Sequence, residues 1–203
     1  NTINGGNYAQ GGSRVSNPIG VSNNPAIGIT TIPVTEQIDR LLADTPTFNR
    51  NDLVALWAGS NDGFIQFATV AVGAITPQVA LAEMSTAATQ LLAQIDRLKA
   101  AGAQNIVVIT VPNLGVTPQA QIIEDGSVSG TPAPGSIALL TALSDSFNNT
   151  LTSAAASKGA VIVDSNKLLS AVIANPARYG FTSPTPLQAA CGNNGGNDPN
   201  TFF

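Results

Sequence analysis

The sequence predicts an α/β sandwich with a mostly parallel sheet, built by a single domain over residues 1–203. Three short apolar runs have the length of buried strands, at residues 53–58, 105–111 and 160–164. Long segments with apolar residues at three- and four-residue steps lie between these runs and predict helices. Strand, helix and strand at this spacing form βαβ units, so we expect parallel strands and right-handed crossovers. We find no internal repeat and no linker that would divide the chain.

The chain begins with a loop, a short helix and the first strand. Residues 1–33 are rich in Asn, Gly, Ser and Pro, as loops are. Residues 35–44 predict a short helix with Thr35 as its N-cap. The apolar run 53–58 then predicts a strand buried on both faces, with Trp57 in the core. A buried helix is the competing interpretation, which the shortness of the run and its sharp end disfavour.

The middle of the chain carries the strongest helix pattern, over residues 77–101. It follows an apolar segment of uncertain structure at 64–75, and Pro77 suits its first turn. The run 105–111 predicts a second buried strand. Residues 112–135 contain four prolines and the acidic pair Glu124-Asp125, so we expect a long, functional or mobile loop with a solvated acidic pair.

The last part of the chain repeats the alternation of helix and strand. Residues 136–157 predict a second long helix, since apolar residues again recur on one face. The run 160–164 predicts a third buried strand, and a short helix follows it up to Asn175-Pro176. Residues 181–203 are polar and loop-like.

The composition limits the classes of partner. Only 10% of residues are charged, against about a quarter in an average soluble domain. The net charge is −4 and the 8 basic residues are scattered singly, so we expect no nucleic-acid partner. No apolar run approaches the roughly 18 residues of a membrane span. No signal peptide is visible at Asn1, from which we expect a mature form or a cut piece.

The turn after the first strand is the candidate site. Gly59, Ser60, Asn61 and Asp62 follow the apolar run, and ligands of parallel sheets bind beyond the carboxyl ends of strands. Asn61 offers an uncharged N–H donor, which suits an oxyanion that appears only during a reaction. We expect Asp62 to hydrogen-bond backbone around the turn.

Several kinds of catalytic site are excluded by the residues present. The chain has no histidine, so it contains no complete Ser-His-Asp triad and no histidine metal ligand. Ser60 lies outside any G-x-S-x-G pattern, and no phosphate-binding loop follows a strand. The single cysteine, Cys191, excludes a cysteine zinc site and indicates a free thiol or a missing partner. The residues therefore offer half of a catalytic site.

Four blocks of residues, taken in order, resemble the SGNH (GDSL) hydrolase family, and most closely the esterase passenger domains of bacterial autotransporters. The similarity covers nearly the whole chain, and its blocks are Asn7-Tyr8-Ala9-Gln10-Gly11-Gly12, Gly59-Ser60-Asn61-Asp62, Val111 to Pro118, and Phe147-Asn148 with Asn175 to Gly180. The resemblance implies a three-layer α/β/α sandwich with a flavodoxin-like sheet. It also implies a secreted or cell-surface esterase or lipase that needs no metal or organic cofactor.

By position, the resemblance assigns the oxyanion hole to the Gly12 backbone N–H, rather than that of Gly11, and to the Asn61 side chain. The family's nucleophilic Ser in a G-D-S block and its Asp-x-x-His block have no match here, so we expect truncation at both ends and an inactive bare chain. The expected partners are an ester or lipid substrate and the missing segments of the same protein. The autotransporter likeness also allows an outer-membrane β-barrel domain in the parent.

Two other functions stay open at this point. An acyltransferase would use the same acyl-enzyme and pass the acyl group to an alcohol other than water. A non-catalytic surface module would use the α/β scaffold, with its Asn- and Thr-rich exterior, to bind glycan or protein. We expect residues 64–75 and 112–135 to line the acyl pocket of an esterase.

Overall fold

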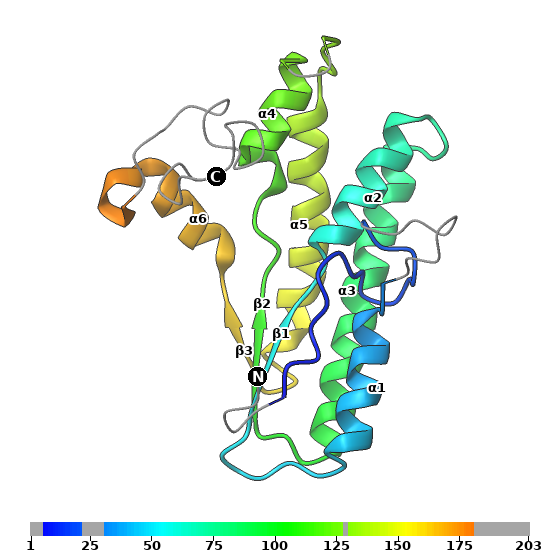
Figure 1. The fold of residues 1–203 in the computed structure, drawn as a ribbon, viewed down its shortest axis with the longest axis vertical. Helices are drawn as coiled ribbons and strands as arrows, with labels where there is room; N and C mark the ends of the chain where they lie inside the picture. Colours follow the sequence, from blue (N-terminus) through cyan, green and yellow to red (C-terminus); the bar gives the residue numbers. More distant parts are fainter. Residues whose placement is uncertain (1–5, 22–30, 128–129, 181–203) are drawn as a thin grey trace.

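A computed structural model describes residues 6–21, 31–127 and 130–180, and the described part has the predicted α/β fold. Its sheet has three parallel strands in the order β1 (Leu53–Trp57), β2 (Asn105–Ile109) and β3 (Ala160–Val163). Helices flank the sheet, in agreement with the layered α/β architecture predicted (Figure 1). The predicted fold class is therefore confirmed.

The described residues form six α-helices and two short 3-10 helices around this sheet. The α-helices are α1 (Val34–Asp44), α2 (Ser60–Ala71), α3 (Pro77–Ala100), α4 (Pro118–Asp125), α5 (Ser136–Ala155) and α6 (Ser165–Ala174). The 3-10 helices are η2 (Leu114–Val116) and η3 (Pro176–Tyr179). The two long helices predicted from periodicity correspond to α3 and α5. Thr76 caps α3 by accepting a hydrogen bond from the Val79 N–H, and Pro77 occupies its first turn as predicted.

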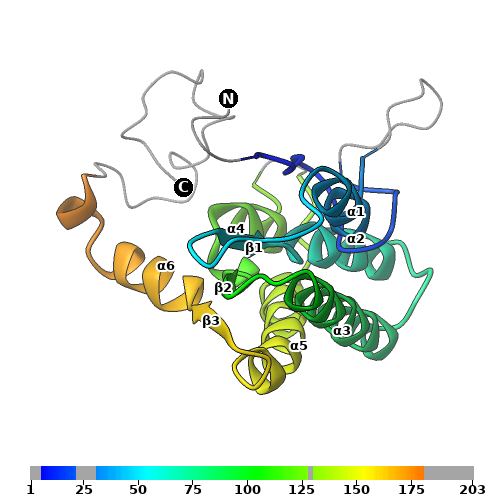
Figure 2. The ribbon, with the colours of Figure 1, turned by 90° about the horizontal axis from the view of Figure 1, so that it is seen from below.

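The core lies between the sheet and the helix pair α3 and α5, which run side by side under one face of the strands (Figure 2). Alternate strand residues such as Leu56 and Val108 point to this face and are buried. They belong to one apolar cluster with Ile95 of α3 and Phe147 of α5, both fully buried. This burial of a helix pair on a parallel sheet supplies the main driving force for the fold.

The opposite face of the sheet is not buried among the described residues, so the prediction for Trp57 was wrong. The Trp57 side chain is 63% exposed, and the burial of β1 alternates instead of being continuous. In register with Trp57, Ile109 is half-buried and Val163 is 42% exposed. A strand covered on one side only has period-two burial, whatever the apolarity of its sequence.

The segment 112–135 is not the long loop that its prolines predict. It contains η2 and then α4, which starts at Pro118 and has the Thr117 hydroxyl as its cap. Glu124 has a structural role. Its carboxylate accepts hydrogen bonds from the N–H groups of Gly135 and Ile137, at 2.9 Å each. These bonds at the start of α5 lower the pKa of Glu124 below its usual value.

Two helical hairpins extend beyond the carboxyl ends of the strands, one made by α2 and α3 and the other by α4 and the start of α5 (Figure 1). Helix α2 begins directly after β1, so its first turn lies at the carboxyl edge of the sheet. In the described part of the chain, none of the helices has both the length and the apolarity that crossing a membrane requires.

Candidate active site

The turn that carries Asn61 and Asp62 is shaped by Gly59. This residue has a φ of +109°, a left-handed conformation that residues with a Cβ rarely adopt. A Cβ on Gly59 would lie 2.6 Å from the Phe147 ring and 2.8 Å from a methyl group of Val111. The close approach of β1, α5 and the chain just after β2 therefore requires glycine at this position. Helix α2 begins at the next residue, Ser60.

We expect Gly59→Ala to destabilise the protein by about 3 kcal/mol or more, because backbone strain adds to overpacking of the core. Chemical denaturation monitored by circular dichroism measures the loss. Gly73→Ala is the matched control, since Gly73 also has a positive φ of 72° but its Cβ would meet nothing within 4 Å. Equal losses in the two variants would contradict the steric part of this account.

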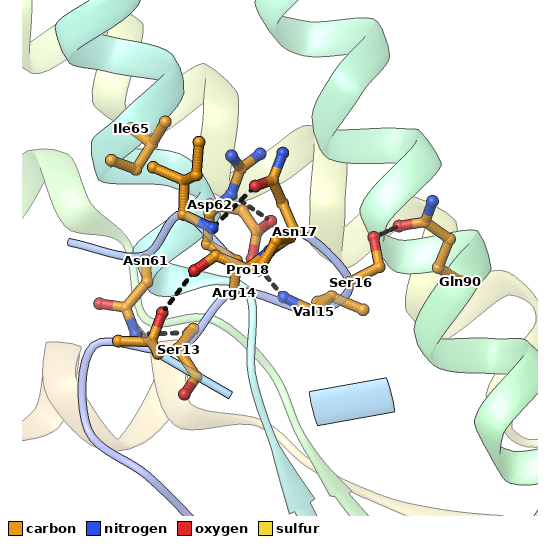
Figure 3. Close-up of polar contacts among 12 residues, drawn as sticks. Ser13, Arg14, Val15, Ser16, Asn17, Pro18, Asn61, Asp62, Ile65 and Gln90 are labelled. Carbon is orange, nitrogen blue, oxygen red and sulfur yellow. Dashed lines mark hydrogen bonds and ion pairs between the residues drawn. The ribbon is translucent and has the colours of Figure 1, made fainter. Parts of the chain in front are cut away.

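Asn61 lies in the first turn of α2 and points to the glycine loop, residues 11–15. Its Nδ2 donates a hydrogen bond to the backbone carbonyl of Ser13, at 2.7 Å (Figure 3). This is the one hydrogen bond of Nδ2 in the described part of the chain, so the second hydrogen of Nδ2 is free to donate. This bond joins Asn61 to Ser13, 48 positions away in sequence and next to Gly12, the residue of the other predicted oxyanion donor.

Asp62 fastens the same loop to α2 from the other side. Its carboxylate accepts one hydrogen bond from the Arg14 Nε and one from the Val15 N–H, both at 3.0 Å. Asp62 is only 3% exposed. Burial raises the pKa of Asp62 above its usual value, and the Arg14 charge and the Val15 N–H oppose that rise. We expected Asp62 to bond backbone around its own turn; the backbone N–H that it accepts from is instead that of Val15 in the glycine loop.

The glycine loop itself is held by backbone contacts. Gly12 has a φ of +81°, and its carbonyl accepts a hydrogen bond from the Val21 N–H at 3.0 Å. Gly20 packs so closely on the Gly12 carbonyl that a Cβ there would overlap it. Within the described residues the Gly12 N–H has no hydrogen-bond partner, whereas its carbonyl is fixed. Gly11 is exposed, and a Cβ on it would meet nothing within 4 Å.

Two residues that sequence reasoning missed complete the support of this loop. The Arg14 side chain forms an ion pair with Asp62, and both side chains are largely shielded from solvent. Gln37 of α1 is buried and donates its Nε2 to the Ser13 Oγ at 3.1 Å and to the Ile32 carbonyl at 2.7 Å. No local pattern marks either residue, because each acts on a partner distant along the chain or outside its own element.

Asn113 and Asn148, from two other blocks of the resemblance, hold the neighbouring loop at the end of β2. The Asn148 carboxamide bonds both the N–H and the carbonyl of Val111, at 2.8 and 2.7 Å. Asn113 accepts hydrogen bonds from the Gly115 N–H and the Thr141 hydroxyl. Ser144 accepts from the Leu114 N–H. These side chains act as local substitutes for backbone partners, so their role is structural.

A groove of about 670 Å³ runs along β1 and α1. It is lined by residues 6–9, by α1 and the chain between α1 and β1, and by every residue of β1. Its position differs from the expected acyl pocket, because neither residues 64–75 nor 112–135 line it. In the described sheet β1 pairs only with β2, so its other edge faces this groove unpaired. Trp57 stands in the groove at the carboxyl end of the strand.

The described residues contain no group of three or more Cys, Asp or Glu side chains arranged to hold a metal ion. Cys191, for which the sequence indicates a free thiol or a missing partner, lies outside the described residues.

The chain matches the family described as GDSL-like Lipase/Acylhydrolase over residues 1–201. No curated protein gives a significant match. The family match covers every described element, and the parallel α/β sheet agrees with it. At this level the match assigns a hydrolase, of the esterase or lipase kind. The chain belongs to the GDSL-like lipase/acylhydrolase family.

Proposed function

We propose that this chain carries the oxyanion half of a serine esterase that works through an acyl-enzyme. Its donors are the Gly12 backbone N–H and the Asn61 Nδ2. The observation that carries the proposal is the 2.7 Å hydrogen bond from the Asn61 Nδ2 to the Ser13 carbonyl. It holds the carboxamide beside the residue that follows Gly12, and leaves one hydrogen of Nδ2 and the Gly12 N–H to donate.

The proposed reaction needs little movement of these two donors. Attack of a serine Oγ on the ester carbonyl turns the carbonyl oxygen into an oxyanion, and the alcohol leaves when that tetrahedral species collapses to the acyl-enzyme. Water then attacks the acyl-enzyme through a second oxyanion and releases the acid. Preorganised N–H donors stabilise both species more than the neutral carbonyl. The positive end of the α2 dipole, at Asn61, adds to this preference.

The nucleophilic serine and the Asp–His pair are, in this proposal, supplied by further segments of the same protein. One edge of β1 has no partner strand among the described residues, and this supports the proposal, since a strand can add to such an edge. A strand that lies parallel to β1 in the groove would end at the carboxyl edge of the sheet, beside Asn61. The chain has no histidine of its own to act as the base.

We place the complete enzyme outside the cell, as a secreted or cell-surface protein of the autotransporter passenger type. The low content of charged residues, 10%, supports this proposal. Protease digestion of intact producing cells, followed by detection of this domain, tests it: a protected domain would argue for an internal location.

We expect no hydrolysis of p-nitrophenyl acetate above background by the 203-residue chain. A version extended by the encoded residues on both sides is expected to turn the ester over, because it supplies the nucleophile and the base. Active-site labelling with a fluorophosphonate checks that the added serine is the group acylated. Robust turnover by the bare chain would contradict the proposed division of the site.

A further inference from the structure

The two glycines of the glycine loop need outside contacts to hold one conformation. Gly11 and Gly12 have no Cβ, so their backbone can take many conformations of similar energy. The bond that the Gly12 carbonyl accepts fixes one side of the pair. The direction of the Gly12 N–H depends in addition on what holds the two flanking residues, Gln10 and Ser13.

A chain of three hydrogen bonds joins these two flanking residues, and Gln37 of α1 is its central member. The Gln10 Oε1 accepts a hydrogen bond from the Ile32 N–H at 2.8 Å. The Gln37 Nε2 then donates to the Ile32 carbonyl at 2.7 Å and to the Ser13 Oγ at 3.1 Å. The glycine pair is therefore closed off by side chains that lie far apart in the sequence.

Gln37 is well suited to hold a fixed geometry. Its Nε2 carries two hydrogens, which matches its two acceptors. Gln37 is 8% exposed and Ser13 is 5% exposed, so water competes little for their hydrogen bond. A buried hydrogen bond of this kind restricts the groups that it joins more than an exposed bond does.

The start of α1 is itself bonded to the glycine loop. The Val34 N–H donates to the Arg14 carbonyl and the Thr35 N–H donates to the Val15 carbonyl, both at 3.0 Å. The first N–H groups of a helix have no partner within the helix, so they are available for these bonds. The backbone that carries Gln37 is therefore held at a fixed place beside the loop.

Ser13 is held from two helices. Its carbonyl accepts the Asn61 Nδ2 of α2 at 2.7 Å, and its hydroxyl oxygen accepts the Gln37 Nε2 of α1 (Figure 3 shows the first of these bonds). In the described part of the chain these are the two hydrogen bonds of Ser13. Loss of the Gln37 bond would leave the residue next to Gly12 with one of them.

We propose that Gln37 is a positioning residue of the candidate oxyanion hole and fixes the direction of the Gly12 N–H by way of Ser13. This inference rests on the proposed function, in which that N–H is a donor to the oxyanion. Gln37 touches no substrate in this account. Its effect on the reaction comes from preorganisation, because a donor that wanders from its direction stabilises the oxyanion less.

Gln37→Met nearly keeps the size of the side chain and removes both of its donors. In the version extended by the encoded residues on both sides, we expect kcat for p-nitrophenyl acetate to fall about tenfold, with little change in KM. Gln94→Met is the matched control. Gln94 of α3 is 6% exposed and also donates its Nε2 to a backbone carbonyl, that of Gln90 at 3.3 Å, so its variant should keep kcat.

A double variant with Ser13→Ala separates positioning from a general loss of stability. Ser13→Ala removes the hydroxyl and leaves the bond of Gln37 to Ile32 in place. Because the chain of hydrogen bonds is then already broken, adding Gln37→Met should lower kcat by less than about twofold further. An equal factor in both backgrounds would overturn the inference, since Gln37 would not act through Ser13.

Relaxation of ¹⁵N in the 203-residue chain tests the same point without turnover. We expect an order parameter of about 0.85 for the Gly12 N–H in the unchanged chain, and below about 0.6 in Gln37→Met and in Ser13→Ala. Gln94→Met should keep the high value. Equal order parameters in Gln37→Met and Gln94→Met would overturn the inference. Circular dichroism shows that each variant is folded, and Ser13→Ala removes the same contact if Gln37→Met does not fold.

Failure of this inference can be told from failure of the proposed function. A large loss of kcat in Asn61→Ala without a loss in Gln37→Met would overturn the inference alone. An extended protein without turnover would contradict the proposed function, and the order parameter of the Gly12 N–H would still decide whether Gln37 fixes that group.

Discussion

Replacing Asn61 by alanine is expected to lower kcat by about 10²–10³-fold in the protein that also carries the nucleophile, because one donor to the oxyanion is lost. The KM should change little, since the donor acts mainly on the transition state. Steady-state hydrolysis of a short p-nitrophenyl ester measures both constants. The free energy of unfolding should fall by only about 1 kcal/mol, which is the value of one hydrogen bond such as the bond to the Ser13 carbonyl.

Asn105→Ala is the matched control for this variant. Asn105 also donates its Nδ2 to backbone carbonyls, those of Arg50 at 2.9 Å and Asp52 at 3.1 Å, but at the amino end of β2. It should cost similar stability and no activity. If Asn61→Ala kept its kcat, the oxyanion role of Asn61 would be wrong.

The largest effect on stability is expected from Asp62→Ala, at about 3–5 kcal/mol. Removing this carboxylate leaves the Arg14 guanidinium without its partner in a site where its side chain is 11% exposed, and frees the Val15 N–H. Urea denaturation measures the change. Asp96→Ala is the control: its bridge to Lys158 is partly solvated, and we expect a loss of about 1 kcal/mol or less.

A double-mutant cycle with Arg14→Ala separates the two contributions. The double variant should be much less destabilised than the sum of the single losses, because no charge remains buried. Additive losses would mean that the pair does not interact. In either variant, amide hydrogen exchange that becomes faster only in residues 11–15 would show that the glycine loop has loosened. A general loss of stability would speed exchange in other segments as well.

The pH dependence of Asp62→Asn should report the buried carboxyl. Because burial raises the pKa of Asp62 in the folded protein above the ordinary value of 3.8, the folded state binds this proton more tightly than the unfolded chain. This group therefore lowers stability as pH rises from about 3.8 through the raised pKa. Asp62→Asn removes that part of the pH slope, and an unchanged slope would contradict the shift.

The elements of the fold follow from the sequence with few errors. The apolar period of α3 and α5 and the short apolar runs of β1, β2 and β3 are local properties, so they could be predicted at their places. Helix α4 was missed because prolines at 112, 118, 132 and 134 resemble a loop, whereas Pro118 occupies the first turn of a helix that Thr117 caps.

The exposure of Trp57 could not be predicted for a different reason. An apolar run shows that a strand could be covered on both faces, but what lies on each face is set by the other elements of the fold. Among the described residues, α3 and α5 cover one face of the sheet, and the face that carries Trp57 is left uncovered. Period and composition contain no information on that choice.

By itself, the sequence determined the class of this protein: the parallel α/β order, the turn at Gly59–Asp62, and the family over residues 1–201. These follow from local patterns and short motifs, whose physical causes act within a few residues. Only the tertiary structure decided that Asn61 and Asp62 bond to the loop of residues 11–15 and that Arg14 and Gln37 support this loop. It also decided that Val72, at the end of α2, is exposed. Contacts between residues tens of positions apart depend on how the whole chain packs, which no local pattern encodes.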